Sequence, residues 1–472
     1  MSPKTSTSPL LEAPMVERVL NSALSRGGDF AEVFAEDRHG TAASLDDGRV
    51  EELSTGRDRG AGVRVVVGET TGYAHTADLS EAGLLAAAEA AAAVAHEQGG
   101  RRTVGLGPAP DERRPGVRLL PEEVEKARKI ELLERADEAA RSSGDAISQV
   151  SAAYGDSRRR MLVANSDGLL VSDDQVRSRF TVSCVALGDT GMQTGFESAA
   201  FTVGFELFEM VDVEQVAATA ARRALTKLSA RPAPSGELPV VLAAGSGGIL
   251  FHEACGHGLE ADHIEKDASV FVGRVGQQVA SPLVTLVDDG TMGPEWGSFA
   301  VDDEGHAAMR NVLIQDGVLT DYMWDFLRAR KQSRASSGNG RRQSYRHLPM
   351  VRMTNTFVLN GGSDPDEIVA QTPRGVYVAK LGGGQVNTPT GDFVFGTTEA
   401  YLIEGGRITE PLRDANLIGN GPEVLTRIDA VGHDFAMGGP GTCGKDGQGV
   451  PVGTGQPTLR ITALTVGGTA GG

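Results

Sequence analysis

Apolar positions at the start of the chain follow a helical pattern first and an alternating pattern afterwards. Residues 1–13 are rich in Ser, Thr and Pro and are expected to form a disordered tail, whereas the spacing from about Met15 to Arg26 predicts a short helix. From Phe30 onwards apolar and polar residues alternate, with turn residues at Asp46-Asp47-Gly48 and from Gly68 to Gly72. Alternation with turns at this spacing predicts a small antiparallel meander.

The pattern then changes to longer helices that flank a second group of strands. An alanine-rich run from Ser80 to about Glu97 stops at Gly99-Gly100, which predicts a helix with a glycine C-cap. Further helices are predicted at Pro121–Ser142 and Val213–Ser229. Between them, strands are expected from Ala146 to about Thr202.

A short polar segment with two prolines, Arg231–Gly236, separates two regions of different character. Before it we expect an N-terminal α+β domain over residues 14–231, and after it a β-rich C-terminal domain over residues 237–472. The fold class is therefore α+β, with helices in the second domain near residues 246–260 and 322–334. The strand-like runs there are Leu238–Ala243, Leu283–Val287, Arg374–Lys380 and Thr458–Val466, with hairpin signals at Asp289-Gly290, Asp316-Gly317 and Gly405-Gly406.

Length and charge narrow the possible functions. With 472 residues the chain is too long for one ordinary core, which agrees with two domains. Its formal net charge of −18 argues against nucleic-acid binding, because such proteins need a basic surface to neutralise phosphates. Arg341, Arg342 and Arg346 form a short basic cluster, but only Tyr345 could stack on a base there. We expect no nucleic-acid partner.

Cysteine usage and apolar run length indicate the compartment. Cys184, Cys255 and Cys443 are too few and too scattered for a disulfide framework. The N-terminal residues contain no sustained apolar segment, and the longest apolar run, Leu84–Ala95, is too short to span a bilayer. A cytoplasmic protein without a membrane partner is expected.

The segment richest in catalytic residue types is His252-Glu253-Ala254-Cys255-Gly256-His257. Neutral imidazoles are zinc ligands, and a carboxylate beside a zinc-activated water can take its proton during attack on a peptide carbonyl. The residue types therefore indicate a zinc hydrolase in which His252 and His257 bind the ion and Glu253 acts as general base. Two packed structural histidines are the alternative interpretation.

The two histidines are five residues apart, whereas the usual spacing is four. On an ideal α-helix of about 3.6 residues per turn, positions i and i+5 lie about 140° apart. Both imidazoles reach one ion if the helix widens locally, as in a π-bulge that Gly256 would ease. They also do so if the helix ends and His257 lies in a turn, and the sequence leaves both conformations open.

A catalytic zinc site needs at least one more protein ligand. The candidates are Cys443, Cys255, Glu260, Asp262, His263 and His306. Cys255 lies inside the motif but is equally suited to be a small buried residue. Cys443 lies in a glycine-rich polar segment, residues 438–448, which is a poor packing environment for an apolar side chain. A thiolate beside Lys445 and a cation is chemically reasonable there.

Other features have structural interpretations beside functional ones. Gly245–Gly248 is expected to begin a helix capped by Ser246, because no Gly-Lys-Ser/Thr of a phosphate loop follows. Asp302–Glu304 is expected to be a solvated turn, with the outer shell of the metal as the alternative. The cluster at Arg341, Arg342 and Arg346 is expected to form surface or interface ion pairs, with a peptide carboxylate as the alternative ligand. Gly382–Gly384 is equally consistent with a turn and with close approach of an extended substrate. The histidines expected to be structural are His263, His306, His347 and His433.

Several long segments together resemble the TldD family of metallopeptidases, also called modulators of DNA gyrase, and the resemblance spans nearly the whole chain. The segments are His252–Glu260 (HEACGHGLE), Ser281–Met292 (SPLVTLVDDGTM), Gly338–Tyr345 (GNGRRQSY), Met353–Thr356 (MTNT), Leu417–Gly421 (LIGNG), Cys443–Gln448 (CGKDGQ) and Gly455-Gln456-Pro457. Cys255 departs from the pattern, because an aliphatic residue is expected at its position.

The resemblance implies a site, a cofactor and a partner. It implies that Zn²⁺ is held by His252, His257 and Cys443, with Glu253 as general base. It also implies a homologous partner chain of the TldE (PmbA) type that lacks the metal motif. The pair is expected to degrade unfolded or leader-type peptides inside an enclosed chamber.

Two other functions remain as alternatives to a peptidase. A regulatory binding protein is suggested by the gyrase-modulator name, but the intact histidine motif together with Cys443 argues against a purely binding role. A zinc-dependent hydrolase of non-peptide amides is compatible with the same residues.

Overall fold

The computed structural model describes residues 9–93, 104–107, 117–189, 191–387 and 389–468. Residues 1–8 of the expected tail and the expected helix end at Gly99-Gly100 lie outside the described residues. Within the tail segment, Leu11 is buried and packs in one core cluster with Val16 of the first helix.

The N-terminal half is built on one long, curved antiparallel sheet. Its strands are β1 (Phe30–Asp46), β2 (Arg49–Val67), β3 (Thr70–Thr76), β4 (Ile147–Asn165), β5 (Leu170–Gly188) and β6 (Gly191–Phe201). They lie in the order β3-β2-β1-β4-β5-β6. The expected meander and the expected second group of strands are therefore confirmed, but they join in one sheet because β1 pairs with β4 along Glu32 to Asp46.

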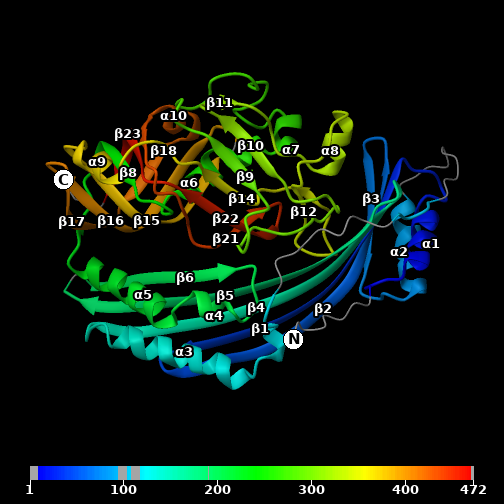
Figure 1. Ribbon diagram of the computed structural model, residues 1–472, viewed down its shortest axis with the longest axis horizontal. Coiled ribbons are helices and arrows are strands. Elements are labelled where there is room, and N and C mark those ends of the chain that lie inside the picture. Colours follow the sequence, from blue (N-terminus) through cyan, green and yellow to red (C-terminus); the bar gives the residue numbers. More distant parts are fainter. Residues whose placement is uncertain (1–8, 94–103, 108–116, 190, 388, 469–472) are drawn as a thin grey trace.

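Helices cover the outer face and one end of this sheet (Figure 1). They are α1 (Ala13–Ala23), α2 (Glu81–Ala92), the 3₁₀ turn η1 (Pro121–Glu123), α3 (Lys126–Arg141), α4 (Leu207–Met210) and α5 (Val213–Leu228). Ser80 caps α2 by accepting the Gly83 N–H, and Asp212 caps α5 by accepting the Glu214 N–H. The four helices expected from the periodicity in this half are confirmed within a few residues at each described end.

The C-terminal half contains two larger sheets and a two-stranded ribbon. One sheet holds β7 (Arg231–Pro232), β8 (Gly236–Leu242), β15 (Arg374–Asn387), β16 (Asp392–Glu404), β17 (Arg407–Arg413), β18 (Asn416–Asn420), β19 (Ile428–Val431) and β23 (Leu459–Gly467). The second holds β9 (Leu286–Asp289), β10 (Arg310–Gln315), β11 (Val318–Leu319), β14 (Asn355–Val358), β20 (Ala436–Met437), β21 (Gly441–Lys445) and β22 (Gln448–Gln456), and the ribbon is β12 (Gly340–Arg341) with β13 (Met350–Val351). In the first sheet the pairing of β15 with β16 closes a ring through β8, β23 and β18.

Short helices complete this half. They are α6 (Gly248–Phe251), η2 (His252–Gly256), η3 (His257–Leu259), α7 (Ala261–Glu265), α8 (Phe326–Lys331), α9 (Pro365–Ala370) and α10 (Gly421–Thr426). The largest core cluster of the chain joins the first sheet to these helices, with Leu242, Phe251 and Leu417 among its members. The expected α+β fold class is confirmed.

Some local expectations differ from the structure. Asp316-Gly317 and Gly405-Gly406 do form tight turns, and all four residues have positive φ. Asp289-Gly290 does not form a tight hairpin, because twenty residues separate β9 from its antiparallel partner β10. Ser246 does not cap α6, since its hydroxyl donates to the carbonyls of Ala243 and Val378.

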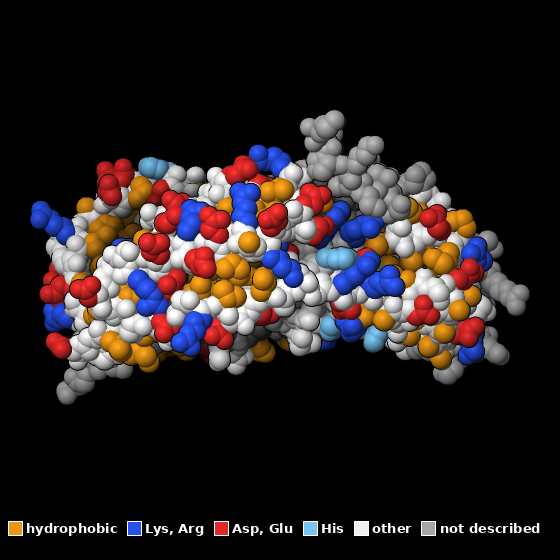
Figure 2. Space-filling view, turned by 90° about the horizontal axis from the view of Figure 1, so that it is seen from below, with side chains coloured by type: hydrophobic (Ala, Val, Ile, Leu, Met, Phe, Trp, Pro, Cys, Tyr) orange, Lys and Arg blue, Asp and Glu red, His pale blue; other side chains and the backbone are white. Residues whose placement is uncertain are grey.

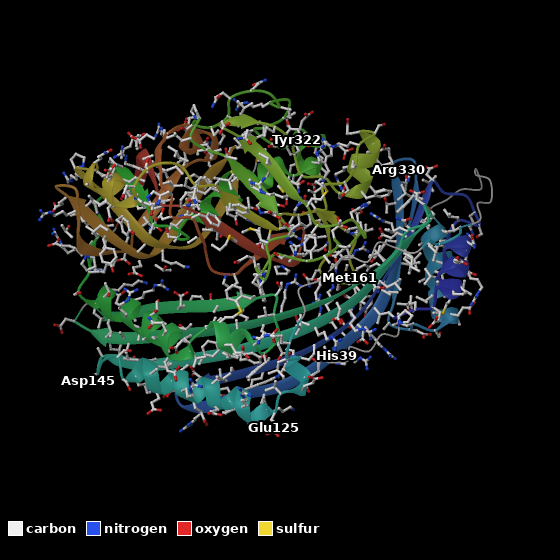
Figure 3. The ribbon with its side chains drawn as sticks, in the orientation of Figure 1. His39, Glu125, Asp145, Met161, Tyr322 and Arg330 are labelled. Carbon is white, nitrogen blue, oxygen red and sulfur yellow. The ribbon has the colours of Figure 1, made fainter. Side chains whose placement is uncertain are left out.

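The inner face of the curved sheet packs against the C-terminal half. Phe34, Met161 and Val163 of the sheet share a core cluster with Val301 and Tyr345. Met161 is labelled in Figure 3, where it lies between the sheet and the layer above it. Residues far apart in the sequence are therefore brought together along this contact.

The opposite face, seen in Figure 2, has acidic and basic side chains interspersed with small hydrophobic groups. Such mixing provides no extended basic surface on that face. Among the helices of the described residues, none has the length and apolar character that crossing a bilayer requires.

Candidate metal centre

The histidine motif forms a locally widened helix. The chain turns as an α-helix over α6, as a π-helix over His252–Gly256, and as a 3₁₀ turn over His257–Leu259. In a π-helix each turn takes up an additional residue, so positions i and i+5 come close to the same side. The widened helix, one of the two conformations that the sequence left open, is therefore the one adopted.

Gly256 has a packing role in this turn. A Cβ at Gly256 would lie 2.2 Å from Sδ of Met353, while the residue itself has ordinary helical φ. The glycine therefore makes room for a side chain of a different segment, and its conformational freedom is not used.

The structure brings His252, His257 and Cys443 together. Their ligand atoms all lie within 4.8 Å of one another, and the two imidazole rings have centroids 5.0 Å apart at 84°. Cys443 Sγ lies 3.5 Å from Nε2 of His257. Ligands of a tetrahedral zinc ion at ordinary bond lengths would be about 3.6 Å apart, so this separation suits one ion between them.

Cys443 reaches the histidines from the hairpin of β21 and β22. Positions 443 and 445 are two residues apart on β21, so their side chains point to the same side of the strand. Burial raises the pKa of the Cys443 thiol, but the charges of His252 and His257 and their hydrogen bonds outweigh it. The pKa therefore lies well below its usual range, which favours the thiolate that binds metal.

Behind His257 lies a buried chain of charged groups. Nδ1 of His257 is 3.0 Å from Oε2 of Glu260, and Lys445 Nζ lies 2.9 Å from the same oxygen and 2.7 Å from Oδ1 of Asp262. Burial lowers the pKa of His257, but Glu260 and Cys443 raise it well above its usual range overall. A carboxylate that accepts Nδ1–H leaves Nε2 free to bind an ion.

One ring nitrogen of His252 has no hydrogen-bond partner among the described residues. Its side chain is buried, and Nδ1 makes no hydrogen bond within the part of the chain that the structure describes. Buried imidazole nitrogens are normally satisfied by a hydrogen bond or a metal. Imidazole nitrogens and cysteine thiolates are both zinc donors, and three protein ligands with one open position are what a catalytic zinc site needs.

Glu253 lies beside the ligand atoms, with Oε2 3.7 Å from Nε2 of His257. Its side chain is 22% exposed, which is more than either histidine and leaves it accessible. Glu253 and His252 line a cavity of about 420 Å³. Lys380 and Gly383 of β15 also line it. This cavity is called the metal-centre pocket below.

The other sequence-predicted ligand candidates lie elsewhere. Cys255 is fully buried in the core, its Sγ donates to the Phe251 carbonyl, and burial raises its pKa to about 12. Glu260, Asp262 and His263 form a second group of close ligand atoms, but the two carboxylates already bind Lys445. His306 stacks on Phe326 with ring centroids 5.4 Å apart.

The interpretation of the acidic run as a solvated turn is wrong. Asp302, Asp303 and Glu304 do not form a solvated turn, since all three are buried. Glu304 pairs with Arg64 at 2.9 Å and Asp303 with Arg159 at 2.8 Å.

The basic cluster is also divided between the interior and the surface. Arg341 and Arg342 are buried, whereas Arg346 is exposed and pairs with Asp58 at 2.5 Å. The glycines Gly382–Gly384 are not a turn either, because they lie within β15 at an irregular point of its pairing with β16.

Three residues near the centre make contacts that the sequence did not predict. Lys445 was expected beside the Cys443 thiolate, and a residue two positions later on a strand does face the same side, but its pairing with Glu260 and Asp262 was not expected. Glu260 was a candidate ligand, but its contact with Nδ1 of His257 depends on the turn between them. Lys380 has no signal in the sequence, and its place in the pocket depends on how β15 lies against the motif helix.

Comparisons with known proteins agree along most of the chain. Family models match residues 31–95 as PmbA/TldA metallopeptidase domain 1, residues 119–228 as the central domain and residues 235–468 as the C-terminal domain. The Metalloprotease TldD homolog of Haemophilus influenzae is 42% identical over 456 residues, which cover 94% of each chain. A Metalloprotease of Methanothermobacter thermautotrophicus is 35% identical over 442 residues, covering 93% of this chain and 96% of that one.

Solved structures share the fold at lower identity. TldE of Thermococcus kodakarensis superposes with a TM-score of 0.78 at 21% identity, covering 96% of this chain and all of the other (100%). A Thermotoga maritima protein described as a candidate modulator of a DNA gyrase has a TM-score of 0.79 at 20% identity, covering 96% and 99%. The family matches and the 42% identical relative together show that this chain belongs to the PmbA/TldD metallopeptidase family.

Proposed function

We propose that this chain is a zinc metallopeptidase whose ion is held by His252, His257 and Cys443. The observation that carries the proposal is the convergence of these three side chains from two distant segments, with ligand atoms within 4.8 Å of one another. The unpartnered Nδ1 of His252 and the lowered pKa of Cys443 support it. One relative, from Saccharolobus solfataricus, is named a zinc metalloprotease TldD homolog.

In this proposal each residue has a distinct task. The zinc ion supplies Lewis acidity, which lowers the pKa of a water and polarises a peptide carbonyl. Glu253 accepts the proton of the attacking water and returns it to the leaving amine. Glu260 holds His257 in the tautomer that presents Nε2, and Lys445 neutralises the Glu260 carboxylate.

The substrates proposed are unfolded or leader-type peptides. An extended chain has free backbone groups, and the metal-centre pocket is lined on one side by strand residues Leu381, Gly382 and Gly383. Apart from its two chain neighbours, no described residue has an atom within 4 Å of the place where a Cβ on Gly383 would be, so a peptide backbone can come close there. We also propose that the chain acts with a homologous TldE/PmbA-like partner that lacks the metal motif.

Zinc content tests the ligand set. Purified chain should contain close to one zinc per molecule, and Cys443→Ala or His252→Ala should lose it. Cys255→Ala is the matched control, because this cysteine lies in the same motif but points into the core. Zinc retained without Cys443, or lost without Cys255, would contradict the ligand set.

Peptide cleavage tests the activity. The zinc-loaded chain, with and without a TldE-like partner, is offered unstructured peptides and small acyl amides. Glu253→Gln should keep zinc and lower hydrolysis by about 100-fold or more, because the general base is removed while the ligands remain. Glu265→Gln, a partly exposed glutamate paired with Lys331, is the control. Cleavage of amides alone, or full activity in Glu253→Gln, would contradict a peptidase with this base.

A further inference from the structure

A second cavity lies between the inner face of the curved sheet and the hairpin that carries Cys443. Its volume is about 220 Å³, and it is lined by residues of β1, β4 and β5 on one side and by Thr442 and Pro451 on the other. Thr442 is the one residue that lines both this cavity and the metal-centre pocket. The two spaces therefore adjoin each other at Thr442.

Five arginines line this space, which we call the arginine cavity. They are Arg38, Arg159, Arg177, Arg341 and Arg342. The strand register explains how the sheet supplies three of them. Arg38 pairs with Arg159 and Arg159 with Gln175, so these side chains form a row across β1, β4 and β5, with Arg177 two positions further along β5. His39, labelled in Figure 3, follows Arg38 and lies on the outer face, as strand alternation requires.

Arg177 and Arg341 donate their hydrogen bonds to uncharged oxygen atoms. Arg177 donates to the carbonyls of Trp296 and Ser298 and to the amide oxygen of Gln175. Arg341 donates to the carbonyls of Met353 and Pro451. Carbonyl acceptors satisfy the N–H groups but do not neutralise the charge.

Two other arginines have N–H groups without an acceptor. Nη2 of Arg159 and both Nε and Nη1 of Arg342 are buried and make no hydrogen bond to the residues that the structure describes. The residues themselves are only 7% and 1% exposed. Their remaining N–H groups bind Glu36, Asp303 and Glu32. Buried guanidinium groups seldom leave such donors unused, since each costs a full desolvation penalty.

The nearby carboxylates do not pair with every arginine. Glu36 and Asp303 pair with Arg159, and Glu32 pairs with Arg342. Arg177 and Arg341 form no ion pair with the residues that the structure describes. Asp302 also lines the cavity, and burial raises its pKa to about 7. Burial and the nearby Arg341 lower the pKa of Arg177 to about 9, and burial lowers that of Arg341 to about 10. Both shifts mean that the cavity destabilises the charged guanidinium groups of Arg177 and Arg341. An anion bound between these two groups would stabilise their charged forms.

We propose that the arginine cavity is an anion-binding site for a single carboxylate or phosphate group carried by a small ligand. Sites for drug-sized ligands have roughly 300–1,000 Å³, so a cavity of this volume suits a ligand about the size of one amino-acid residue. Planar guanidinium groups bind both anions in a bidentate manner. The rings of Trp296 and Phe299 form an apolar wall for the rest of the ligand.

Trp296 provides a local signal for the test. It is one of two tryptophans in the chain, and its Nε1–H donates to the carbonyl of Gly441 at 3.0 Å. In a Trp324→Phe background, fluorescence reports Trp296 alone. The full-length chain is first freed of metal, so that an anion cannot bind at the metal centre instead.

Three probes are titrated: inorganic phosphate, trialanine with a free carboxylate, and trialanine amide. Saturable quenching by phosphate or by trialanine, but not by the amide, is the expected result. Binding of phosphate alone would identify a phosphate site, and binding of trialanine alone would identify a peptide carboxylate site. No saturable change with either anion would overturn the proposal.

Matched variants locate the binding. Arg177→Met should weaken binding by about tenfold or more, because a charge-assisted pair is lost. Arg346→Met removes the same charge from the surface and should leave binding unchanged. Gln175→Glu places a carboxylate 2.8 Å from Arg177 and should also weaken anion binding, because the new charge competes for this guanidinium. It replaces Arg177→Met as the test variant if Arg177→Met does not fold. Equal binding by all three variants would overturn the proposal.

Discussion

At the residue scale, the contact between Glu260 and His257 should determine how firmly the proposed site holds zinc. Glu260 is fully buried, and His257 and Lys445 outweigh its burial and hold its pKa well below the usual range. The ionised form is therefore favoured, and it accepts Nδ1–H of His257. Asp262 shares Lys445 with it, so one buried ammonium group lies between two carboxylates.

Glu260→Gln should lower zinc affinity by about 10–100-fold, since an amide holds the imidazole and Lys445 less firmly than a carboxylate. The measurement is competition for zinc with a chromophoric chelator. Glu423→Gln, at a surface position, is the control. An unchanged affinity in Glu260→Gln would mean that the contact does not position His257.

The three cysteines should differ sharply in reactivity. The pKa of Cys443 is lowered, whereas burial raises that of Cys184 to about 11 and that of Cys255 to about 12. Near pH 7, the metal-free chain should therefore be alkylated by iodoacetamide at Cys443 first, because only the thiolate reacts. Peptide mass spectrometry identifies the modified site.

Zinc should protect Cys443 from this alkylation if it is a ligand. The reaction should persist below the ordinary thiol pKa of 9.0 and cease only as the pH falls through the lowered pKa of the folded chain. Modification of Cys255 ahead of Cys443, or no protection by zinc, would contradict this assignment.

At the element scale, the widened turn of η2 is what makes the five-residue histidine spacing usable. Residue spacing alone showed that an ideal α-helix would turn the two rings apart, so the sequence predicted either this widening or a helix end before His257, but it did not decide between them. It was not sufficient to explain Gly256, whose neighbour Met353 lies almost a hundred residues later. Turns with two adjacent left-handed residues, such as Gly405-Gly406, were predictable for the same local reason.

Gly256→Ala should destabilise the chain by about 1–3 kcal/mol and reduce bound zinc, because the added methyl group would overlap Met353 Sδ. Met353→Ala in the same chain should restore much of the zinc content by making room. Gly362→Ala is the control, since nothing lies within 4 Å of its added methyl group. Zinc content and chemical denaturation are measured together, and a Gly256→Ala chain that equals Gly362→Ala in both would contradict the packing argument.

At the scale of the whole molecule, the features that the sequence could not predict depend on contacts between residues far apart in the chain. A run of three acidic residues is normally solvated, so Asp302–Glu304 was interpreted as a turn. Its partners Arg64 and Arg159 lie 240 and 144 residues earlier, on β2 and β4. No local pattern identifies such pairs, although the α+β class and the order of most elements followed from periodicity. Cys443 was found only because its glycine-rich surroundings and the family resemblance singled it out.

The buried pairs between the two halves should make stability depend on pH in an unusual direction. Burial raises the pKa of Glu304 from 4.5 to about 7, although Arg64 opposes this. The folded chain therefore binds a proton that the unfolded chain has released between these values. By linkage, the free energy of unfolding falls as pH rises through this window. Above about pH 7 Glu304 is ionised in both states, and the loss of stability from its buried charge is then complete.

Replacing Glu304 by Gln should remove this titration while keeping an acceptor for Arg64. Between pH 5 and pH 8, wild-type chain should lose on the order of 1–3 kcal/mol more stability than Glu304→Gln. Urea unfolding at both pH values measures the difference, and Glu423→Gln should behave as the wild type because its side chain is 65% exposed. Parallel losses in wild type and Glu304→Gln would mean that Glu304 is ionised throughout, and that Arg64 outweighs its burial.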